Sequence, residues 1–332
     1  MSGEGGIWVL ADPRAGTAAQ ALGIAERLDR PFRAVPLEWG PLARLPLPWP
    51  GLLGLTARAR EGLRRAALEG PWSRVPPGTT PRIVPEWPSL VIAAGRRSAP
   101  VSRWLRRQGA RTVHCMRPGA AAADFDLLVI GRHDHPAPAP NILPILGATH
   151  RISPAALAAA RESRPDLAAL PRPRVAVLLG GAVRGEGMDP AEAAAIIGRV
   201  VPGAGSVLAT TSRRTGAAAA EAVAARLSGV PGLLHRWGQE GPNPYAAFLA
   251  LADAVVVTGD SVSMLSEALA TSAPVFVAGT PPDAPRHMAL RESLFAAGQA
   301  APFAAFPNAP PRAPLDESGR VAAVIRDRFL AG

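Results

Sequence analysis

Residues 254–267 read Ala-Val-Val-Val-Thr-Gly-Asp-Ser-Val-Ser-Met-Leu-Ser-Glu. The apolar run predicts a buried strand, and a helical pattern starts directly after Thr-Gly-Asp-Ser. Such a turn offers backbone N–H groups, hydroxyls and a helix start, which together suit a phosphate group. Glu267 stands about two turns into the predicted helix, where its carboxylate could accept from a hydroxyl of the same ligand. An ordinary strand–turn–helix corner, capped by Asp260 or Ser261, fits the same residues.

Short apolar runs alternate with longer helical segments along the whole chain, a pattern typical of parallel sheets in α/β proteins. Predicted strands are residues 7–11, 32–36, 90–94, 112–115, 127–130 and 142–145, and then 174–179, 206–210, 233–236, 254–258 and 274–278. Predicted helices are residues 17–28, 56–68, 98–108 and 154–162, and then 190–200, 216–227, 244–251, 263–270, 287–296 and 318–329. The tail from 280 to 314 is Pro-rich, and we expect little regular structure there beyond the helix at 287–296.

The 332 residues suit two domains, and the Pro-rich stretch around 164–173 predicts the linker between them. The two halves also contain similar sequence patterns. Residues 92–98 read Ile-Ala-Ala-Gly-Arg-Arg-Ser and residues 208–215 read Leu-Ala-Thr-Thr-Ser-Arg-Arg-Thr. Each is a strand followed by small residues, an arginine pair and a hydroxyl. We therefore expect an α/β fold of two doubly wound, Rossmann-like halves, 1–165 and 173–314, facing each other across a cleft.

The composition is that of a globular protein, with 48% hydrophobic and 19% charged residues. The single cysteine, Cys115, cannot form a disulfide within the chain, which fits a reducing, cytoplasmic location. Residues 1–10 lack the features of a signal peptide, and no run of 18 apolar residues predicts a transmembrane helix.

The formal net charge is +10, and every basic residue is arginine, as is common in proteins of GC-rich genomes. A basic surface favours anionic partners such as phosphates, nucleic acid or acidic lipid headgroups. The chain has no zinc finger, aromatic RNA-binding signature or basic arm, so we expect no nucleic-acid partner. The arginine-rich residues 52–68 could lie on an anionic membrane surface, but the preferred interpretation is a core-facing helix with a solvated basic side.

Two groups of residues in the second half could bind a diphosphate. Residues 210–215 place two arginines beside hydroxyls at a helix start, and arginine binds phosphate oxygens in bidentate fashion. A solvated, hydroxyl-capped helix start is the alternative. Gly180 and Gly181 follow a predicted strand and would allow a ligand to approach the backbone closely, although they also fit a simple tight turn.

Three groups in the first half follow predicted strands. The first turn carries Asp12, a catalytic candidate that could equally be a helix cap. Residues 95–98 follow the third strand, and His133-Asp134-His135 follows the fifth. Asp134 or His133 could act as a general base. The His-Asp-His run lacks a third ligand at a suitable spacing, so we expect no metal site.

These stretches resemble the elongated-mitochondria family, which includes a plant mitochondrial fission protein and many bacterial relatives regarded as GT-B glycosyltransferases. The resemblance is carried by residues 7–12 with Gly16 and Gln20, by 93–100, 141–144, 210–215 and 243–245, and by 257–264 with Glu267. It implies a GT-B-like fold in which the C-terminal domain holds a nucleotide sugar. It also implies that the final helix, within 315–332, packs back on the N-terminal domain.

Together, the turns and the resemblance predict transfer of a sugar from a nucleoside diphosphate sugar to a cell-envelope acceptor, without a cofactor or a metal ion. The expected donor-site residues are Gly180, Gly181, Thr211, Ser212, Arg213, Arg214, Thr215, Gly259, Asp260, Ser261, Ser263, Met264 and Glu267. The expected acceptor-side residues are Arg14, Gly16, Gln20, Gly95, Arg96, Arg97, Ser98, His133 and Asn141, with Asp12 and Asp134 as candidate bases.

Two alternatives share this fold. One is a non-catalytic scaffold, peripheral at the inner membrane, that binds a membrane surface and a protein partner. The other is a different sugar-phosphate enzyme such as an epimerase.

Overall fold

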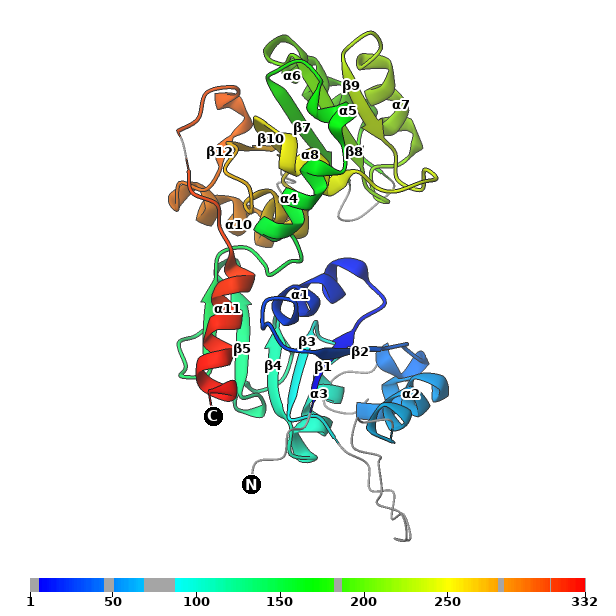
Figure 1. Ribbon diagram of the computed structural model, residues 1–332, viewed down its shortest axis with the longest axis vertical. Helices are drawn as coiled ribbons and strands as arrows, with labels where there is room; N and C mark the ends of the chain where they lie inside the picture. The colour runs from blue at the N-terminus through cyan, green and yellow to red at the C-terminus, as the bar shows by residue number, and fades with distance from the viewer. Residues whose placement is uncertain are drawn as a thin grey trace. The chain divides into compact units, whose positions relative to one another are not determined.

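The computed structural model describes residues 6–44, 51–68, 87–181, 187–279, 284–310 and 312–331. The chain forms two compact units. Unit 1 comprises Met1–Arg151 and Glu317–Gly332, and unit 2 comprises Ile152–Asp316. Each contains one six-stranded parallel sheet with helices on both faces (Figure 1). The predicted α/β class, with two doubly wound Rossmann-like halves, is confirmed.

The sheet of unit 1 has the order β2-β1-β3-β4-β5-β6. Its strands are β1 (Ile7–Ala11), β2 (Phe32–Pro36), β3 (Leu90–Ala94), β4 (Arg111–Cys115), β5 (Leu127–Gly131) and β6 (Ile142–Ile145). The second strand is added on one side of β1 and all later strands on the other. The point where the order reverses, which is where doubly wound sheets bind ligands, therefore lies between β1 and β3.

Alternate residues of the unit 1 strands point to opposite faces of the sheet. Ile7 and Val9 contribute to one core cluster, and Trp8 and Leu10 contribute to another. Helices α1 (Ala15–Ala25) and α11 (Glu317–Ile325) cover the first face, and α2 (Ala57–Leu68) and α3 (Ala99–Arg107) cover the second. Short 3-10 turns, η1 (Pro41–Arg44), η2 (Gly51–Gly54), η3 (Ala122–Asp124) and η4 (Arg132–Asp134), complete the connections, and a π-helical turn, η7 (Arg326–Leu330), follows α11.

The sheet of unit 2 has the order β12-β11-β10-β7-β8-β9. Its strands are β7 (Arg174–Leu179), β8 (Ser206–Thr211), β9 (Gly232–His235), β10 (Ala254–Thr258), β11 (Val275–Ala278) and β12 (Ala301–Pro302). Numbered from β7, this is the order 3-2-1-4-5-6 of dinucleotide-binding Rossmann folds. The reversal point lies between β7 and β10.

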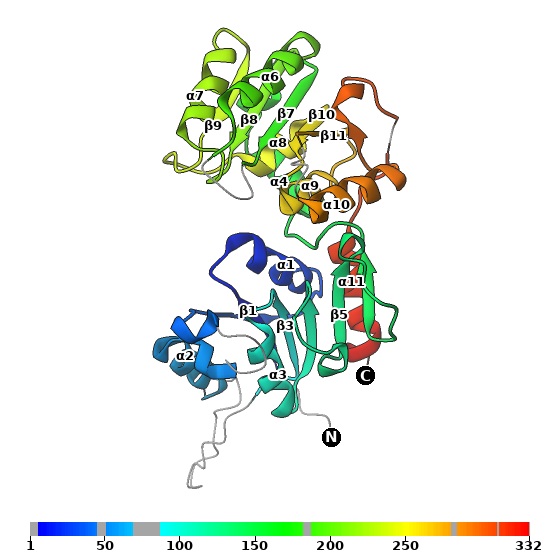
Figure 2. The ribbon, with the colours of Figure 1, turned by 180° about the vertical axis from the view of Figure 1, so that it is seen from behind.

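Helices α6 (Pro190–Val200) and α7 (Ala217–Arg226) pack on one face of this sheet, around Val177, Ala209 and Val256. They lie in front in the view from behind (Figure 2). Helix α8 (Tyr245–Leu251) contacts β7 and β8 on the opposite face, where α4 (Pro154–Glu162) packs against it. The remaining elements are α5 (Pro165–Ala168), η5 (Val201–Gly203), α9 (Val262–Ala268), α10 (Pro285–Ala296) and η6 (Phe303–Ala305).

The boundary between the units falls after Arg151, earlier than the predicted linker around 164–173. Helix α4, which the sequence pattern placed in the N-terminal half, belongs to unit 2. It packs against α8, and the Arg161 Nε–H donates to the Ala250 carbonyl at 3.1 Å. The Pro-rich residues 171–173 therefore lie inside unit 2 and lead directly into β7.

The last helix completes unit 1. Val321, Ala322 and Ile325 are fully buried in the same core cluster as Ile24 of α1. At its first turn, Glu317 Oε1 accepts from the Leu146 N–H at 2.7 Å. The Ser318 hydroxyl donates to the His150 carbonyl at 2.9 Å and accepts from the His150 N–H at 2.8 Å. Unit 1 is therefore built from two separate stretches of chain.

No helix within the described ranges combines the length and the apolar character that crossing a bilayer requires. Helix α2 buries its apolar side, Ala59, Leu63, Ala66 and Ala67, against unit 1 and leaves Arg58, Arg64 and Arg65 exposed. This is the core-facing arrangement that the sequence interpretation preferred over membrane contact.

Candidate functional site

Three polar turns leave the unit 2 sheet at neighbouring strand ends. Strand β7 pairs with β10 on one side and with β8 on the other, so its carboxyl end lies between theirs. The turns after these strands carry Gly180 and Gly181, Gly259 and Asp260, and Ser212 to Thr215. The structure thus brings together the residues that the sequence nominated for the donor, at the reversal point of the sheet.

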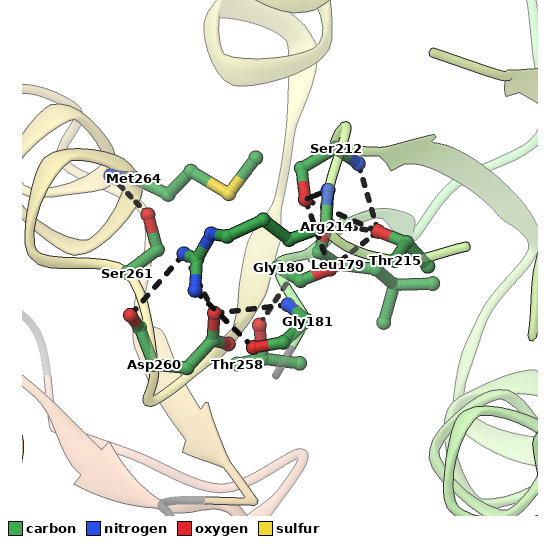
Figure 3. A network of polar contacts seen from close by, with 10 residues as sticks. All are labelled: Leu179, Gly180, Gly181, Ser212, Arg214, Thr215, Thr258, Asp260, Ser261 and Met264. Atoms are coloured by element: carbon green, nitrogen blue, oxygen red, sulfur yellow. Dashed lines mark hydrogen bonds and ion pairs between the residues drawn. The ribbon is translucent and has the colours of Figure 1, made fainter. Parts of the chain in front are cut away.

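Backbone N–H groups of the turn after β7 donate to side chains at the end of β10 and in the turn that follows it (Figure 3). Gly180 N–H donates to Thr258 Oγ1 at 2.7 Å, and Gly181 N–H donates to Asp260 Oδ2 at 2.9 Å. Both acceptors are buried. These donors hold the turns together, so they do not point at open solvent.

Arg214 braces all three turns. Its Nη2 lies 2.9 Å from Asp260 Oδ2, and its Nη1–H donates to the Gly181 carbonyl at 3.3 Å (Figure 3). The Asp260 side chain is only 4% exposed, whereas that of Arg214 is 33% exposed. The buried carboxylate is therefore neutralised by a guanidinium that still reaches the surface.

Arg213 has a different environment from its neighbour. Its side chain is exposed, and its guanidinium makes no ion pair or hydrogen bond with the described residues. Helix α7 starts four residues later, and its N-cap, Gly216, has no side chain to bind the first N–H groups. An unengaged guanidinium next to an uncapped helix start can bind an anion.

The hydroxyls of the arginine turn bind within the protein. Ser212 Oγ donates to the Gly180 carbonyl at 2.9 Å, and Thr215 Oγ1 accepts from the Ser212 N–H at 2.8 Å. Thr211 Oγ1 accepts from the Trp237 N–H at 2.9 Å. These three side chains therefore position the turn.

The two glycines after β7 are required by neighbouring protein atoms. A Cβ on Gly180 would lie 2.3 Å from both Asp260 carboxylate oxygens, and one on Gly181 would lie 1.9 Å from the Arg214 carbonyl oxygen. From the sequence, we expected the absence of side chains at these glycines to let a ligand approach the backbone. In the structure it holds the packed turns, so here the glycines serve the contact between turns.

Helix α9 carries the rest of the nominated donor residues. Ser261 caps it weakly, accepting from the Met264 N–H at 3.4 Å, and Ser263 is half-buried. The Tyr245 hydroxyl of α8 donates to Glu267 Oε2 at 2.6 Å. Burial raises the pKa of the Glu267 carboxyl to about 7, although the tyrosine hydrogen bond opposes this. Burial and the neighbouring carboxylate raise the pKa of Tyr245 well above its ordinary value.

Two further titratable groups lie near Asp260 that the sequence did not single out. Glu192, in the first turn of α6, reaches the end of β11, because a Cβ on Gly279 would lie 2.1 Å from its Oε1. Burial and the charges of Asp189 and Asp260 raise the Glu192 pKa. Burial lowers the pKa of His287 on α10, against the opposing effect of Asp260. The acidic start of α6 was visible in the sequence, whereas nothing in the pattern marked His287.

In unit 1, Asp12 follows β1 beside the reversal point and is buried. Its Oδ1 accepts from the Arg14 N–H at 2.8 Å, and its Oδ2 accepts from Trp39 Nε1–H at 3.0 Å. Both oxygens therefore hold local structure. Arg14 and Gly16 are exposed at the same turn, and Gln20 is buried farther along α1.

The turn after β3 lies on the other side of the reversal point. Gly95 has φ of 85°, a conformation that glycine adopts without strain. Arg96 and Arg97 are exposed there, whereas the buried Ser98 hydroxyl bonds to the carbonyls of its own turn, with Ala94 O at 2.6 Å. The exposed arginines are the groups of this turn that could meet a ligand.

His133 and Asp134 lie in η4 after β5, and both are buried, with His133 Nε2 3.9 Å from Asp134 Oδ2. Within the described residues, no three His, Cys, Asp or Glu side chains are arranged to hold a metal ion. Asn141 precedes β6, and so lies at the amino edge of the sheet, away from the other nominated residues. Its amide donates to the Ala122 and Phe125 carbonyls at 2.8 and 2.9 Å, which is a structural task.

A family model described as mitochondrial fission ELM1 matches residues 15–329. The chain is 31% identical over 221 residues to the mitochondrial fission protein ELM1 of Arabidopsis thaliana, covering 58% of this chain and 52% of that protein. It is 28% identical over 131 residues to the uncharacterized protein RP120 of Rickettsia prowazekii, covering 39% of this chain and 32% of that one. The matches thus span about half and about a third of these relatives.

Among solved structures, similarity extends over both units. The UDP-GlcNAc 2-epimerase of Methanocaldococcus jannaschii gives a TM-score of 0.55 at 13% identity, covering 98% of this chain and 99% of that one. The UDP-GlcNAc 2-epimerase of Neisseria meningitidis, bound to UDP-GlcNAc, gives a TM-score of 0.53 at 12% identity, covering 98% of this chain and 100% of that one. At this identity the similarity establishes the fold, which is GT-B-like.

Proposed function

The chain belongs to the mitochondrial fission ELM1 family, and we propose that it is a glycosyltransferase whose unit 2 binds a nucleoside diphosphate sugar. The sugar passes to an acceptor of the cell envelope that unit 1 binds. The N. meningitidis epimerase of the same fold was solved with UDP-GlcNAc, which supports a nucleotide sugar as the ligand.

One observation carries the proposal: the turns after β7, β8 and β10 meet at the reversal point of a 3-2-1-4-5-6 sheet and leave Arg213 unengaged beside them. The Asp260–Arg214 pair fixes the turns, so Arg213 is presented by a rigid frame. The start of α6 is acidic, with Asp189 as its cap and Glu192 in its first turn. A diphosphate is therefore favoured on the β8 side, next to Arg213 and the start of α7.

Glu267 is proposed to bind hydroxyls of the ribose or the transferred sugar. Its Oε2 is held by Tyr245, which fixes the direction of the carboxyl group. In the reaction, an acceptor oxygen bonds to the anomeric carbon as the bond from that carbon to the diphosphate oxygen breaks. The leaving diphosphate takes the electron pair beside Arg213, and a base takes the acceptor proton. The candidates for this base are Asp134, beside His133, and Asp12, whose oxygens accept from Trp39 Nε1–H and the Arg14 N–H.

Titration calorimetry with UDP, GDP, CDP and ADP tests the donor site. We expect one or more of these to bind, and Arg213→Ala to weaken binding by about 10- to 100-fold, since charge-assisted hydrogen bonds contribute roughly 1.5–3 kcal/mol. Arg226→Ala, which removes an exposed arginine at the far end of α7, is the matched control. Equal nucleotide affinity in Arg213→Ala and wild type would show that Arg213 does not bind the diphosphate. Product analysis with the matching nucleotide sugar then separates transfer from epimerisation.

A second candidate function is a scaffold that binds a membrane surface and a protein partner. It is favoured by Leu53, which is 60% exposed in η2, close in sequence to the exposed arginines of α2. Exposed apolar and basic groups together suit an anionic bilayer. Co-sedimentation with anionic and with neutral vesicles tests it. If the chain serves only as a scaffold, Glu267→Gln and Asp260→Asn will leave its function in cells intact.

A further inference from the structure

Trp237 stands out among the large apolar side chains. It is 62% exposed, and it is the only large hydrophobic side chain in the described part of unit 2 that is mostly exposed. Single exposed hydrophobic residues are common on protein surfaces, so exposure alone assigns nothing. Two further observations bear on Trp237: its backbone is held in an ordered turn, and that turn lies beside the proposed phosphate site.

The backbone around Trp237 is held by three hydrogen bonds. Its own N–H donates to Thr211 Oγ1 at 2.9 Å. The Gln239 N–H donates to the Arg236 carbonyl at 3.1 Å, and the Arg236 N–H donates to Gln239 Oε1 at 3.1 Å. Gly238 has φ of 80°, as the third residue of a type II turn requires. The indole is thus presented to solvent by an ordered turn.

This turn lies beside the proposed phosphate site. Thr211, which receives the Trp237 N–H, is the last residue of β8 and directly precedes Ser212 and Arg213. Strand β9, which ends just before the turn, is the neighbour of β8 and lies two strand spacings, roughly 10 Å, from β7. Trp237 is therefore on the same edge of the sheet as Arg213, on the side away from the acidic start of α6.

We propose that the indole of Trp237 stacks on the nucleobase of the bound nucleoside diphosphate. The inference rests on the proposed function and adds the base subsite to it. With the diphosphate beside Arg213, the turn after β9 is the neighbouring turn on the side away from α6, and its indole is an exposed aromatic face there. A planar aromatic ring offers a stacking surface for any base, so Trp237 supplies affinity without selecting the base.

The test compares nucleotides with a ligand that lacks the base. Full-length wild type, Trp237→Ala and Trp237→Phe are titrated with UDP, GDP, ADP and inorganic pyrophosphate. We expect Trp237→Ala to weaken every nucleotide that binds wild type by roughly 5- to 150-fold, and to leave pyrophosphate binding unchanged. Trp237→Phe retains an aromatic face and is expected to lose less. Leu53→Ala, which removes a comparably exposed apolar side chain of unit 1, is the control.

Fluorescence gives a second measurement. Trp237 is the one tryptophan of unit 2 among seven in the chain, and the other six lie in unit 1. Stacking on a base should therefore change wild-type emission on nucleotide addition, and Trp237→Phe should bind without that change.

Equal nucleotide affinity in Trp237→Ala and wild type would overturn the stacking inference and leave the diphosphate site standing. A parallel loss of pyrophosphate binding would also overturn it, since the tryptophan would then act through the turn of Arg213. Failure of wild type to bind any nucleotide or pyrophosphate would instead overturn the proposed function, and the base subsite with it.

Discussion

Glu267 and Tyr245 form a hydrogen-bonded pair, with 2.6 Å between the tyrosine oxygen and Oε2, joining α9 to α8. Burial raises the pKa of Glu267 to about 7. The carboxyl group is then near half protonation at neutral pH, so it can both donate to and accept from a ligand hydroxyl. Such a group suits the proposed role of Glu267 in binding a sugar hydroxyl.

Because the folded-state pKa of Glu267 lies above the unfolded value of about 4.3, the native state binds the extra proton. The stabilising contribution is fully present below about pH 4.3 and is lost as the pH rises through about 7. A shift of this size corresponds to roughly 4 kcal/mol. We therefore expect the melting temperature of wild type, relative to Glu267→Gln, to fall between pH 5 and pH 8.

Thermal unfolding of the two proteins across that range checks this expectation. The other titrating groups are common to both and cancel in the difference. A difference in melting temperature that stays constant with pH would show that Glu267 does not titrate in this range.

The neighbouring residues Arg213 and Arg214 have identical side chains but different interactions. Asp260 holds Arg214, whereas Arg213 makes no ion pair or hydrogen bond with the residues that the structure describes. Their order in the sequence does not determine this division, because it depends on which guanidinium faces a buried carboxylate 46 residues away, in the turn after β10.

At the scale of elements, α9 depends on a residue far along the chain. Arg312 donates from Nη1 to the Leu269 carbonyl at 3.0 Å, from Nη2 to the Ala268 carbonyl at 3.1 Å and from Nε to the Ala273 carbonyl at 3.0 Å. These carbonyls lie at and beyond the end of the helix, which bears Glu267 and Ser261. Burial lowers the pKa of Arg312 to about 10. The guanidinium stays charged at neutral pH and caps the helix.

Replacing Arg312 with Leu should leave these buried carbonyls without their donor, at a cost of about 1–3 kcal/mol for an unsatisfied group and more if several are lost. We expect a lower urea midpoint for unit 2. Arg226→Leu, at an exposed site on α7, serves as the control and should change the midpoint little. If both variants unfold at the same urea concentration, Arg312 does not stabilise α9.

Most elements could be predicted because strands with continuous apolar runs, such as β10, and helices with clear starts, such as α6, carry local signals. Strand β12 could not, because it has two residues and depends on its pairing with β11. The reason for glycine at positions 180 and 181 could not be predicted either. The atoms that exclude a Cβ there belong to turns that are distant in sequence. Asn141 was assigned to the acceptor side because it is polar. It precedes β6, however, and so lies at the amino edge of the sheet, where its amide binds backbone carbonyls.

For the whole molecule, the interior of unit 1 depends on a helix that follows unit 2 in the chain. Ile325 is fully buried against the cluster that includes Ile24 and Val9. Ile325→Ala should cost about 2–5 kcal/mol, as large-to-small substitutions in cores do. We expect this loss of unfolding free energy in unit 1 and not in unit 2.

Tryptophan emission can isolate this effect. In a Trp237→Phe background all the tryptophans lie in unit 1, so denaturant unfolding followed by fluorescence reports on that unit. Adding Ile325→Ala should lower its midpoint. Nucleotide-dependent protection of unit 2 from proteolysis should stay the same, and a matching loss there would mean that the two units unfold together.

The hydrogen bonds between Ser318 and His150 have a further consequence, for synthesis on the ribosome. They join residues made before unit 2 to residues made after it. At about 5–20 residues per second, the intervening chain takes on the order of ten seconds to translate. During that interval the nascent unit 1 exposes the apolar face that α11 will cover. The later-made unit can thus finish folding first, while the earlier-made one waits as a target for chaperones that recognise exposed apolar surface.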